Sequence, residues 1–264
     1  MSEPILETRD GFVVTLTLNR PEHRNVISSP EMVQAVEDKV AAINADAGVR
    51  AVILTGAGPA FSAGGDVKEM AAPDGLHSRP PYDVRNWYVN GIQRIPRAIY
   101  SLEVPLIAAV NGFAIGAGND LACMCDIRIA AESARFASSF AKIGIIPGDG
   151  GAYFLTRIVG HARAAEMIFT GKTIDAAEAL QWGLVSKVVA DDQLLIEAGR
   201  LAAEIAANPA HVLRLSKRLL REAHTLSLDT VLELSASMQA VAHATKEHYD
   251  AVTALVEKLS KKPA

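Results

Sequence analysis

The apolar positions of the first third of the chain follow two periodicities. Over residues 12–18 they alternate, which predicts a strand buried mainly on one face. After a polar loop over residues 19–25, Ser29 and Pro30 supply the cap and first position of a helix. Apolar residues then recur at helical spacing, at Val33, Val36, Val40 and Ile43. Residues 51–55 have no polar interruption, which predicts a strand covered on both faces.

Strand-like segments continue to about residue 195, and the chain beyond that point is helical in pattern. Apolar runs at 105–110 and 126–130 predict further strands, whereas residues 71–81, rich in proline and glycine, predict a mobile loop. This order predicts an α/β fold with a core over residues 1–195 and a helical C-terminal region over residues 196–264. Periodicity alone leaves open whether the core repeats ββα turns or is doubly wound.

Two glycine-rich segments each stand between a predicted strand and a predicted helix. The first is Phe61–Met70 and the second is Asn111–Asp120. Small residues at such a turn let backbone N–H groups approach a ligand closely. Two of these turns meeting at one point would form an oxyanion hole, which stabilises negative charge on a carbonyl oxygen. Taken singly, each segment is better explained as an ordinary tight turn.

These segments belong to a set of five motifs that resembles, in order and spacing, those of the crotonase (enoyl-CoA hydratase/isomerase) superfamily. The five stretches are Leu18–Asn25, Phe61–Met70, Ala109–Ile127, Gly144–Gly151 and Gly171–Val189. The resemblance implies a crotonase-like spiral of ββα units with a helical C-terminal extension. It also implies an acyl-coenzyme A thioester as substrate, with no separate cofactor. Relatives assemble as trimers or paired trimers, so a homotrimer or a dimer of trimers is expected, with a subunit-packing role for the helical C-terminal region.

Carried over residue by residue, the resemblance assigns the oxyanion hole to the backbone N–H groups of Gly65 and Ala117. Alanine stands where the family more often has glycine, which is tolerable because the N–H does the chemistry. The resemblance places CoA along Arg24 and Val26, with its adenine end near the backbone of Ala63, Asp66 and Val67. Lys258 matches a lysine that in relatives reaches a CoA phosphate in a neighbouring subunit. A solvated surface charge is the alternative for Arg24 and Lys258.

The resemblance breaks at the acid/base residues, where hydratase members use two glutamates to hold a water and move a proton. The first of these positions is Asp120, which can act as a general acid or base or stabilise the start of its helix. The second is Phe140, which can do neither, so the hydratase pair is incomplete. Asp149 is a substitute candidate, with a turn-forming role as the alternative. Some isomerase and dehalogenase relatives place an aspartate one position earlier, where this chain has Gly148.

The sequence therefore predicts an enzyme that acts on an acyl-CoA thioester through an enolate, by hydration or by a double-bond shift, with Asp120 as the main acid/base. A hydrolase or decarboxylase of the same superfamily is one alternative, and a CoA-binding protein without turnover is another. The residues that shape the acyl pocket are expected within 71–100 and 138–142, although Trp87 and Tyr88 are interpreted as helix packing.

Composition narrows the class of partner. The 264 residues carry a formal net charge of −4 and no dense run of Lys and Arg, which argues against a nucleic-acid binder. No apolar run approaches the ~20 residues that span a bilayer. The N-terminus lacks a targeting pattern, so a cytoplasmic enzyme is expected. No metal-ligand cluster is evident, and Cys123 and Cys125 are expected to be small apolar filler.

Overall fold

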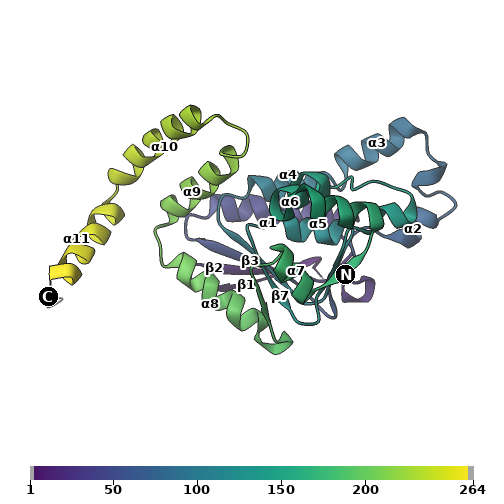
Figure 1. The fold of residues 1–264 in the computed structure, drawn as a ribbon, viewed down its shortest axis with the longest axis horizontal. Helices are drawn as coiled ribbons and strands as arrows, with labels where there is room; N and C mark the ends of the chain where they lie inside the picture. The colour runs from purple at the N-terminus through teal and green to yellow at the C-terminus, as the bar shows by residue number, and fades with distance from the viewer. Residues whose placement is uncertain (1–2, 261–264) are drawn as a thin grey trace.

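The computed structural model describes residues 3–260, and its largest element is a six-stranded sheet (Figure 1). The strand order is β1-β2-β3-β5-β7-β10. β1 runs antiparallel to β2, and each later neighbouring pair is parallel. The strands are β1 (Ile5–Asp10), β2 (Val13–Leu18), β3 (Ala51–Gly56), β5 (Leu106–Val110), β7 (Ile127–Ala131) and β10 (Lys187–Val189).

A second sheet has four strands in the order β4-β6-β8-β9. They are β4 (Ala60–Ser62), β6 (Phe113–Ile115), β8 (Arg135–Ala137) and β9 (Thr173–Asp175). Three successive passages of the chain each place one strand in the main sheet and the next strand in the second sheet: β3 then β4, β5 then β6, and β7 then β8. The chain therefore advances as a spiral of ββα units, and the α/β fold class predicted from the resemblance is confirmed.

Helices follow the strand pairs and cover the sheets. They are α1 (Pro30–Ala45), α2 (Val67–Ala71), α3 (Pro81–Asn90), α4 (Arg94–Ser101), α5 (Ala117–Met124), α6 (Gly151–Thr170), α7 (Ala176–Trp182), α8 (Leu194–Ala206), α9 (Ala210–Glu222), α10 (Leu228–His243) and α11 (Lys246–Ser260). Short 3₁₀ turns occupy Pro21–His23, Leu76–Ser78, Ser139–Ile143 and Asp191–Gln193. α1 begins where the sequence predicts, because the Ser29 side chain accepts a hydrogen bond from Met32 N.

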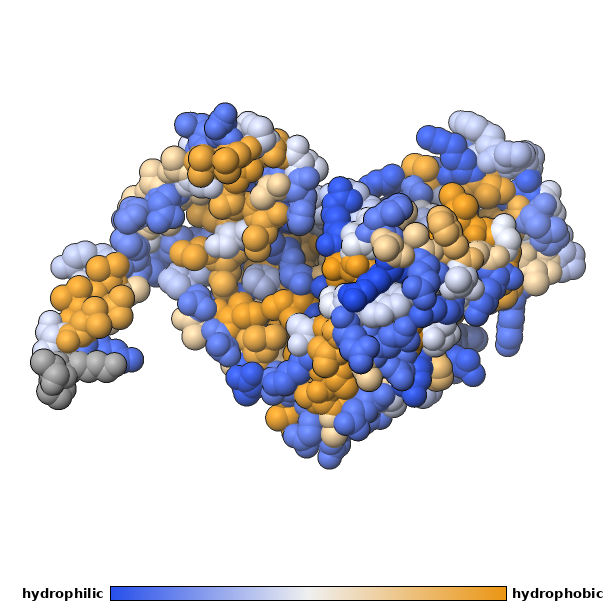
Figure 2. Space-filling view, in the orientation of Figure 1, coloured by the Kyte–Doolittle hydropathy of each residue, from blue (hydrophilic) through white to orange (hydrophobic). Residues whose placement is uncertain are grey.

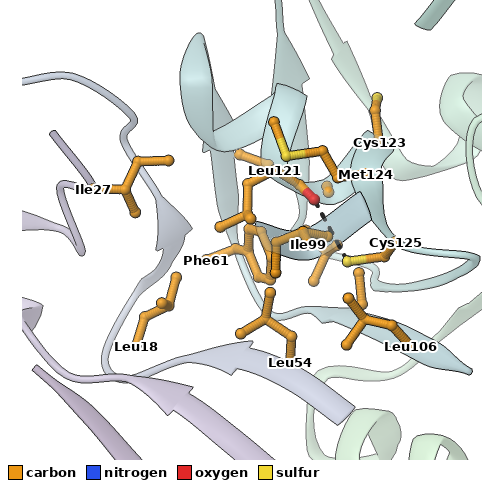
Figure 3. Packing of buried hydrophobic residues seen from close by; sticks show 14 of the residues in the cluster. Leu18, Ile27, Leu54, Phe61, Ile99, Leu106, Leu121, Cys123, Met124 and Cys125 are labelled. Carbon is orange, nitrogen blue, oxygen red and sulfur yellow. Dashed lines mark hydrogen bonds between the residues drawn. The ribbon is translucent and has the colours of Figure 1, made fainter. Parts of the chain in front are cut away.

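The central strands β3 and β5 of the main sheet are buried on both faces, as the unbroken apolar run of β3 predicted. Val52 and Leu54 belong to the larger core, which continues through Phe61, while Ala51 and Ile53 belong to a second cluster on the opposite face. Figure 3 shows the larger core, where strand residues such as Leu18, Leu54 and Leu106 face Phe61, Ile99 and Leu121. Two cysteines lie in this core, and burial raises the pKa of the Cys123 and Cys125 thiols to about 12. Both thiols are neutral at physiological pH, as expected of apolar filler.

α8 packs against the main sheet. Its small residues Ala198, Ala202 and Ala206 recur every four positions and pack against the face of the sheet that carries Ile53 and Ile107. α9 is also tied to the core, because the buried Lys217 Nζ lies 2.7 Å from Asp126 Oδ2 and donates to Val104 O. The folded core therefore includes α8 and α9, and the separate helical region begins near α10.

α10 and α11 form an arm that projects away from the rest of the chain (Figure 1). α10 contacts α9, and α11 contacts α10. Figure 2 shows apolar side chains on the surface of this arm. Its exposed apolar residues include Leu228, Leu232, Val241, Tyr249, Leu255 and Leu259.

Candidate active site

The two glycine-rich segments meet backbone to backbone. β4 and β6, the strands that lead into them, are parallel neighbours in the second sheet. Gly64 has a φ of +82°, and a Cβ added there would lie 2.6 Å from Ile115 O and 2.7 Å from Ala117 N. A Cβ at Gly118 would lie only 2.1 Å from Ser62 O. Since a real Cβ never approaches backbone so closely, the contact between the two turns requires glycine at both positions.

A pocket opens at this junction, and it will be called the central pocket. It is lined by residues of the first segment (Ala63, Gly65 and Val67), of the second (Gly116 and Ala117), of α3 and the turn after it (Trp87, Tyr88 and Ile92), and of the loop before α6 (Ser139, Phe140, Ile143, Ile145 and Asp149), together with Ser28 and Met70. The sequence expectation that residues 71–100 and 138–142 shape a pocket agrees with this wall.

Gly65 and Ala117 each bring a backbone N–H group to the lining of the central pocket, one from each segment. Within residues 3–260, neither Gly65 N–H nor Ala117 N–H donates a hydrogen bond to a protein acceptor. Ala117 is the first residue of α5, so the positive end of that helix dipole also points at the pocket. The two N–H groups predicted to form the oxyanion hole thus border one cavity and are unpaired in the single chain.

Asp149 is the carboxyl group that lines the central pocket. Its side chain is 5% exposed, and its Oδ1 has no hydrogen-bond partner among the described residues. Burial raises the pKa of Asp149 to about 6. A carboxylate with a pKa near the working pH exchanges protons readily in both directions, which is the property that general acid/base catalysis requires.

Asp120, by contrast, is fully buried and is absent from the pocket lining. Its Oδ2 accepts a hydrogen bond from Gly151 N at 3.1 Å, at the first turn of α6. Burial, and secondarily the charge of Asp149, raises the pKa of Asp120 well above its usual value. A Cβ at Gly151 would lie 2.3 Å from Asp120 Oδ1. Asp120 therefore anchors the segment that presents Asp149.

Phe140 and Tyr88 give the central pocket an aromatic wall. Phe140 stands in the 3₁₀ turn Ser139–Ile143, 7% exposed, at the position where the hydratase pattern has its second glutamate. Tyr88 lies across Gly148, where an added Cβ would be 3.1 Å from the ring. A side chain at position 148 would therefore require the Tyr88 ring to shift, and the carboxyl that this turn presents to the pocket is that of Asp149. Trp87 and Tyr88 both pack against the larger core, as the sequence interpretation had it, and both also line the central pocket.

The residues assigned to CoA are brought together beside the first segment, with one exception. Ala63 N donates to Arg24 O at 2.8 Å, and Val26 forms a bridge with Gly64. Asp66 caps α2 by accepting hydrogen bonds from Lys68 N and Glu69 N, which leaves the adjacent Val67 exposed. Lys258 lies on the exposed α11 of the arm, far from this cluster within the single chain (Figure 1).

The buried side chain of Asn25 explains how the opening loop reaches this position. Its Nδ2 donates to Ala57 O and Ala60 O, and its Oδ1 accepts from Arg20 N. Arg24 and Asn25 both adopt positive φ, at 50° and 54°, so that the loop turns back on β4.

Among residues 3–260, no group of three or more His, Cys, Asp or Glu side chains is placed to hold a metal ion. No helix in that range is long and apolar enough to cross a membrane.

The chain resembles known proteins along nearly its whole length. The family model described as enoyl-CoA hydratase/isomerase matches residues 8–262. The short-chain-enoyl-CoA hydratase of Clostridium acetobutylicum is 38% identical over 259 residues, which cover 98% of this chain and 96% of that protein. The 1,2-epoxyphenylacetyl-CoA isomerase of Escherichia coli is 37% identical over 261 residues, which cover 98% of each chain.

Solved structures agree with these sequence matches. The crystal structure of an enoyl-CoA hydratase from Bacillus anthracis superposes with a TM-score of 0.89 at 35% identity, covering 97% of this chain and 96% of that one. That of an enoyl-CoA hydratase from Mycobacterium smegmatis gives a TM-score of 0.90 at 32% identity, covering 97% of each chain. The spiral fold and these matches define an enzyme of the crotonase superfamily. The chain belongs to the enoyl-CoA hydratase/isomerase family, as its motifs predicted.

Proposed function

We propose that this enzyme shifts a carbon–carbon double bond in an enoyl-CoA, with Asp149 as the group that carries the proton. The observation that supports this proposal is that Gly65, Ala117 and Asp149 line one pocket. They bring to it two unpaired N–H donors and one carboxyl group, the pKa of which is raised to about 6 by burial. A double-bond shift needs one base that takes a proton and returns it elsewhere. The aromatic wall at Phe140 supplies no second carboxyl.

In this mechanism the thioester carbonyl oxygen accepts hydrogen bonds from Gly65 N–H and Ala117 N–H. The Asp149 carboxylate removes a proton from Cα of a β,γ-unsaturated thioester, and the electron pair moves onto the carbonyl oxygen as a dienolate. The two N–H groups stabilise that oxyanion, and each such donor is typically worth about 3 kcal/mol in the transition state. Protonated Asp149 then returns the proton to Cγ, which gives the α,β-unsaturated product with no net change in composition.

Hydration is the second candidate function. Relatives named as enoyl-CoA hydratases share this fold and 32–38% of the sequence. Asp120 Oδ1 and Asp149 Oδ1 are both buried acceptors without a protein partner, which are groups that a bound water would satisfy. In that case Asp149 would activate the water, and Asp120, the carboxyl whose pKa burial raises well above its usual value, would be the acid of the pair.

The CoA moiety is proposed to lie along Arg24 and Val26, with its adenine end at the backbone of Ala63, Asp66 and Val67. Coenzyme A enters as part of the substrate. Lys258 could serve this site only from another copy of the chain, since its own arm points away. We propose assembly as a homotrimer or a dimer of trimers through the α10–α11 arm, because the apolar surface of that arm is uncovered in the single chain. We also propose that the enzyme is cytoplasmic.

The test is mass spectrometry and ¹³C NMR of trans-3-hexenoyl-CoA and of crotonyl-CoA, each incubated with the protein in D₂O. Conversion of the first to its trans-2 isomer, with deuterium entering the acyl chain, supports isomerisation. Addition of one D₂O to the second substrate supports hydration. Release of free CoA would instead point to a hydrolase. Tight CoA binding, measured by calorimetry, with no change in either substrate would reject both candidate reactions for these acyl groups.

Asp149→Asn is the decisive variant, because the amide is isosteric but cannot accept a proton. It should remove turnover while CoA binding persists. Asp83→Asn, on the exposed first turn of α3, is the matched control and should leave turnover intact. Full activity in Asp149→Asn would overturn the assignment of the proton carrier.

A further inference from the structure

A second hollow lies beside the central pocket and shares part of its wall. It will be called the side groove, and it is lined by Arg85, Tyr88, Val89, Gln93, Ile145, Ile146 and Gly148. Tyr88 and Ile145 line both the central pocket and the side groove. Apart from Arg85 at α3 and the amide of Gln93, the side groove is apolar. It is therefore a surface that a hydrocarbon chain would cover favourably.

The Tyr88 ring is held in this shared wall by contacts on several sides. It packs on the backbone of Gly148, where an added Cβ would lie 3.1 Å from Cε1, and meets the Trp87 ring edge-on at a centroid distance of 5.1 Å. Gln93 holds the backbones of Tyr88 and Gly148 in place, because its backbone N donates to Tyr88 O at 3.0 Å and its side chain donates to Gly148 O at 2.9 Å. The Tyr88 ring therefore has a fixed position between the central pocket and the side groove, unlike a free surface side chain.

From this geometry we infer that Tyr88 determines acyl-chain length: its ring closes the central pocket against the side groove and restricts the enzyme to short acyl groups. This inference rests on the proposed function, since it assumes that the acyl group occupies the central pocket beside Asp149. Beyond the ring, Val89, Ile145 and Ile146 form an apolar path that a longer chain would follow if the ring were absent.

The experiment compares kcat/KM for two chain lengths, trans-3-hexenoyl-CoA and trans-3-dodecenoyl-CoA, in the wild type and in Tyr88→Ala. The wild type should prefer the shorter substrate. Tyr88→Ala should raise the ratio of long-chain to short-chain kcat/KM by about tenfold or more, since each buried methylene adds discrimination of that order. Tyr88→Phe keeps the ring and should keep the wild-type ratio. An unchanged ratio in Tyr88→Ala, or an equal shift in Tyr88→Phe, would overturn the inference.

A second variant connects the effect to the side groove. Ile146 is 78% exposed and lines the side groove but not the central pocket. Ile146→Asp should leave short-chain turnover of the wild type unchanged, and it should cancel the long-chain gain when combined with Tyr88→Ala. Persistence of the gain in the double variant would show that the chain takes another path. If the wild type turned over no enoyl-CoA at all, the proposed function itself would be rejected. Failure of the proposed function is therefore distinguishable from failure of the chain-length inference.

Discussion

Gly64 and Ala117 are in backbone contact: a Cβ on Gly64 would lie 2.7 Å from Ala117 N, in a residue whose φ is already +82°. The position of one proposed oxyanion donor therefore depends directly on the absence of a side chain in the other segment. Because positive φ and a steric clash act together there, no side chain fits without moving the backbone.

Gly64→Ala should consequently lower kcat/KM for an enoyl-CoA by about a hundredfold or more, the typical effect of losing one oxyanion donor. Stability should also fall, by about 1–3 kcal/mol. Gly144→Ala is the control, since that glycine has φ +73° but open space around its Cβ, so it should cost stability without a comparable loss of activity. Equal activity losses in the two variants would mean that the segment contact does not position the donor.

The pKa of Asp149 makes activity and stability respond oppositely to pH. Its carboxylate is the proposed base, so turnover should rise with pH and level off above about pH 6. The pKa of Asp149 is about 6 in the folded protein and that of an ordinary aspartate is 3.8, so between these values the native state binds more protons than the unfolded chain. Stability therefore falls as pH rises through this window and is constant above it.

Asp149→Asn removes this buried charge and should stabilise the protein by about 3 kcal/mol at pH 8, with little effect at pH 4. Urea denaturation at both pH values, at one protein concentration, measures the difference. A destabilised variant at pH 8 would contradict the assignment of a desolvated carboxylate.

Asp120 is expected to anchor Gly151 through the hydrogen bond that its Oδ2 accepts from Gly151 N. Asp120→Asn retains an uncharged acceptor for Gly151 N and should change stability by less than about 1 kcal/mol, whereas Asp120→Ala leaves that N–H unpaired and should cost about 1–3 kcal/mol. Thermal unfolding of both variants tests this order. Turnover by Asp120→Asn then decides whether Asp149 or Asp120 carries the proton. Complete loss of activity with intact folding would assign that role to Asp120.

Lys217 is the buried cation that fastens α9 to the core. Burial lowers the pKa of Lys217, but the Asp126 carboxylate at 2.7 Å opposes that shift. Lys217→Ala leaves Asp126 and Val104 O without this partner and should destabilise the chain by about 3 kcal/mol. Arg218→Ala, at the neighbouring exposed position, should change stability by less than about 0.5 kcal/mol. Equal effects would show that the pair does not hold α9.

The sequence predicted the strands and glycine turns well because their signals are local. The unbroken β3 run and the Ser29 cap both appear in the structure as expected. Motif spacing likewise placed Gly65, Ala117 and Asp149 near one another, but it could not say which aspartate faces the pocket. That depends on side-chain direction: Asp120 points at Gly151 N, while Asp149 lines the central pocket.

The limits of the core were harder to predict for a related reason. α8 looked like the start of the helical extension because a helix pattern does not reveal what it packs against. A local signal was present nevertheless, in the alanines at 198, 202 and 206, which give α8 a narrow face that fits closely on a sheet. Tyr88 gave no such signal, since an aromatic residue on a helix packs against core far more often than it divides two cavities.

The pairing of β4 with β6 has a consequence for how this enzyme tolerates change. Gly65 and Ala117 follow two adjacent parallel strands, whose spacing of about 4.8 Å is fixed by the hydrogen bonds between them. The backbone pairing of β4 with β6 thus sets the gap between the two donors, together with the hydrogen bond from Gly64 N to Ser62 Oγ. Insertions in the surface loops leave this pairing unchanged, whereas a slip of one residue between β4 and β6 would move one donor relative to the other.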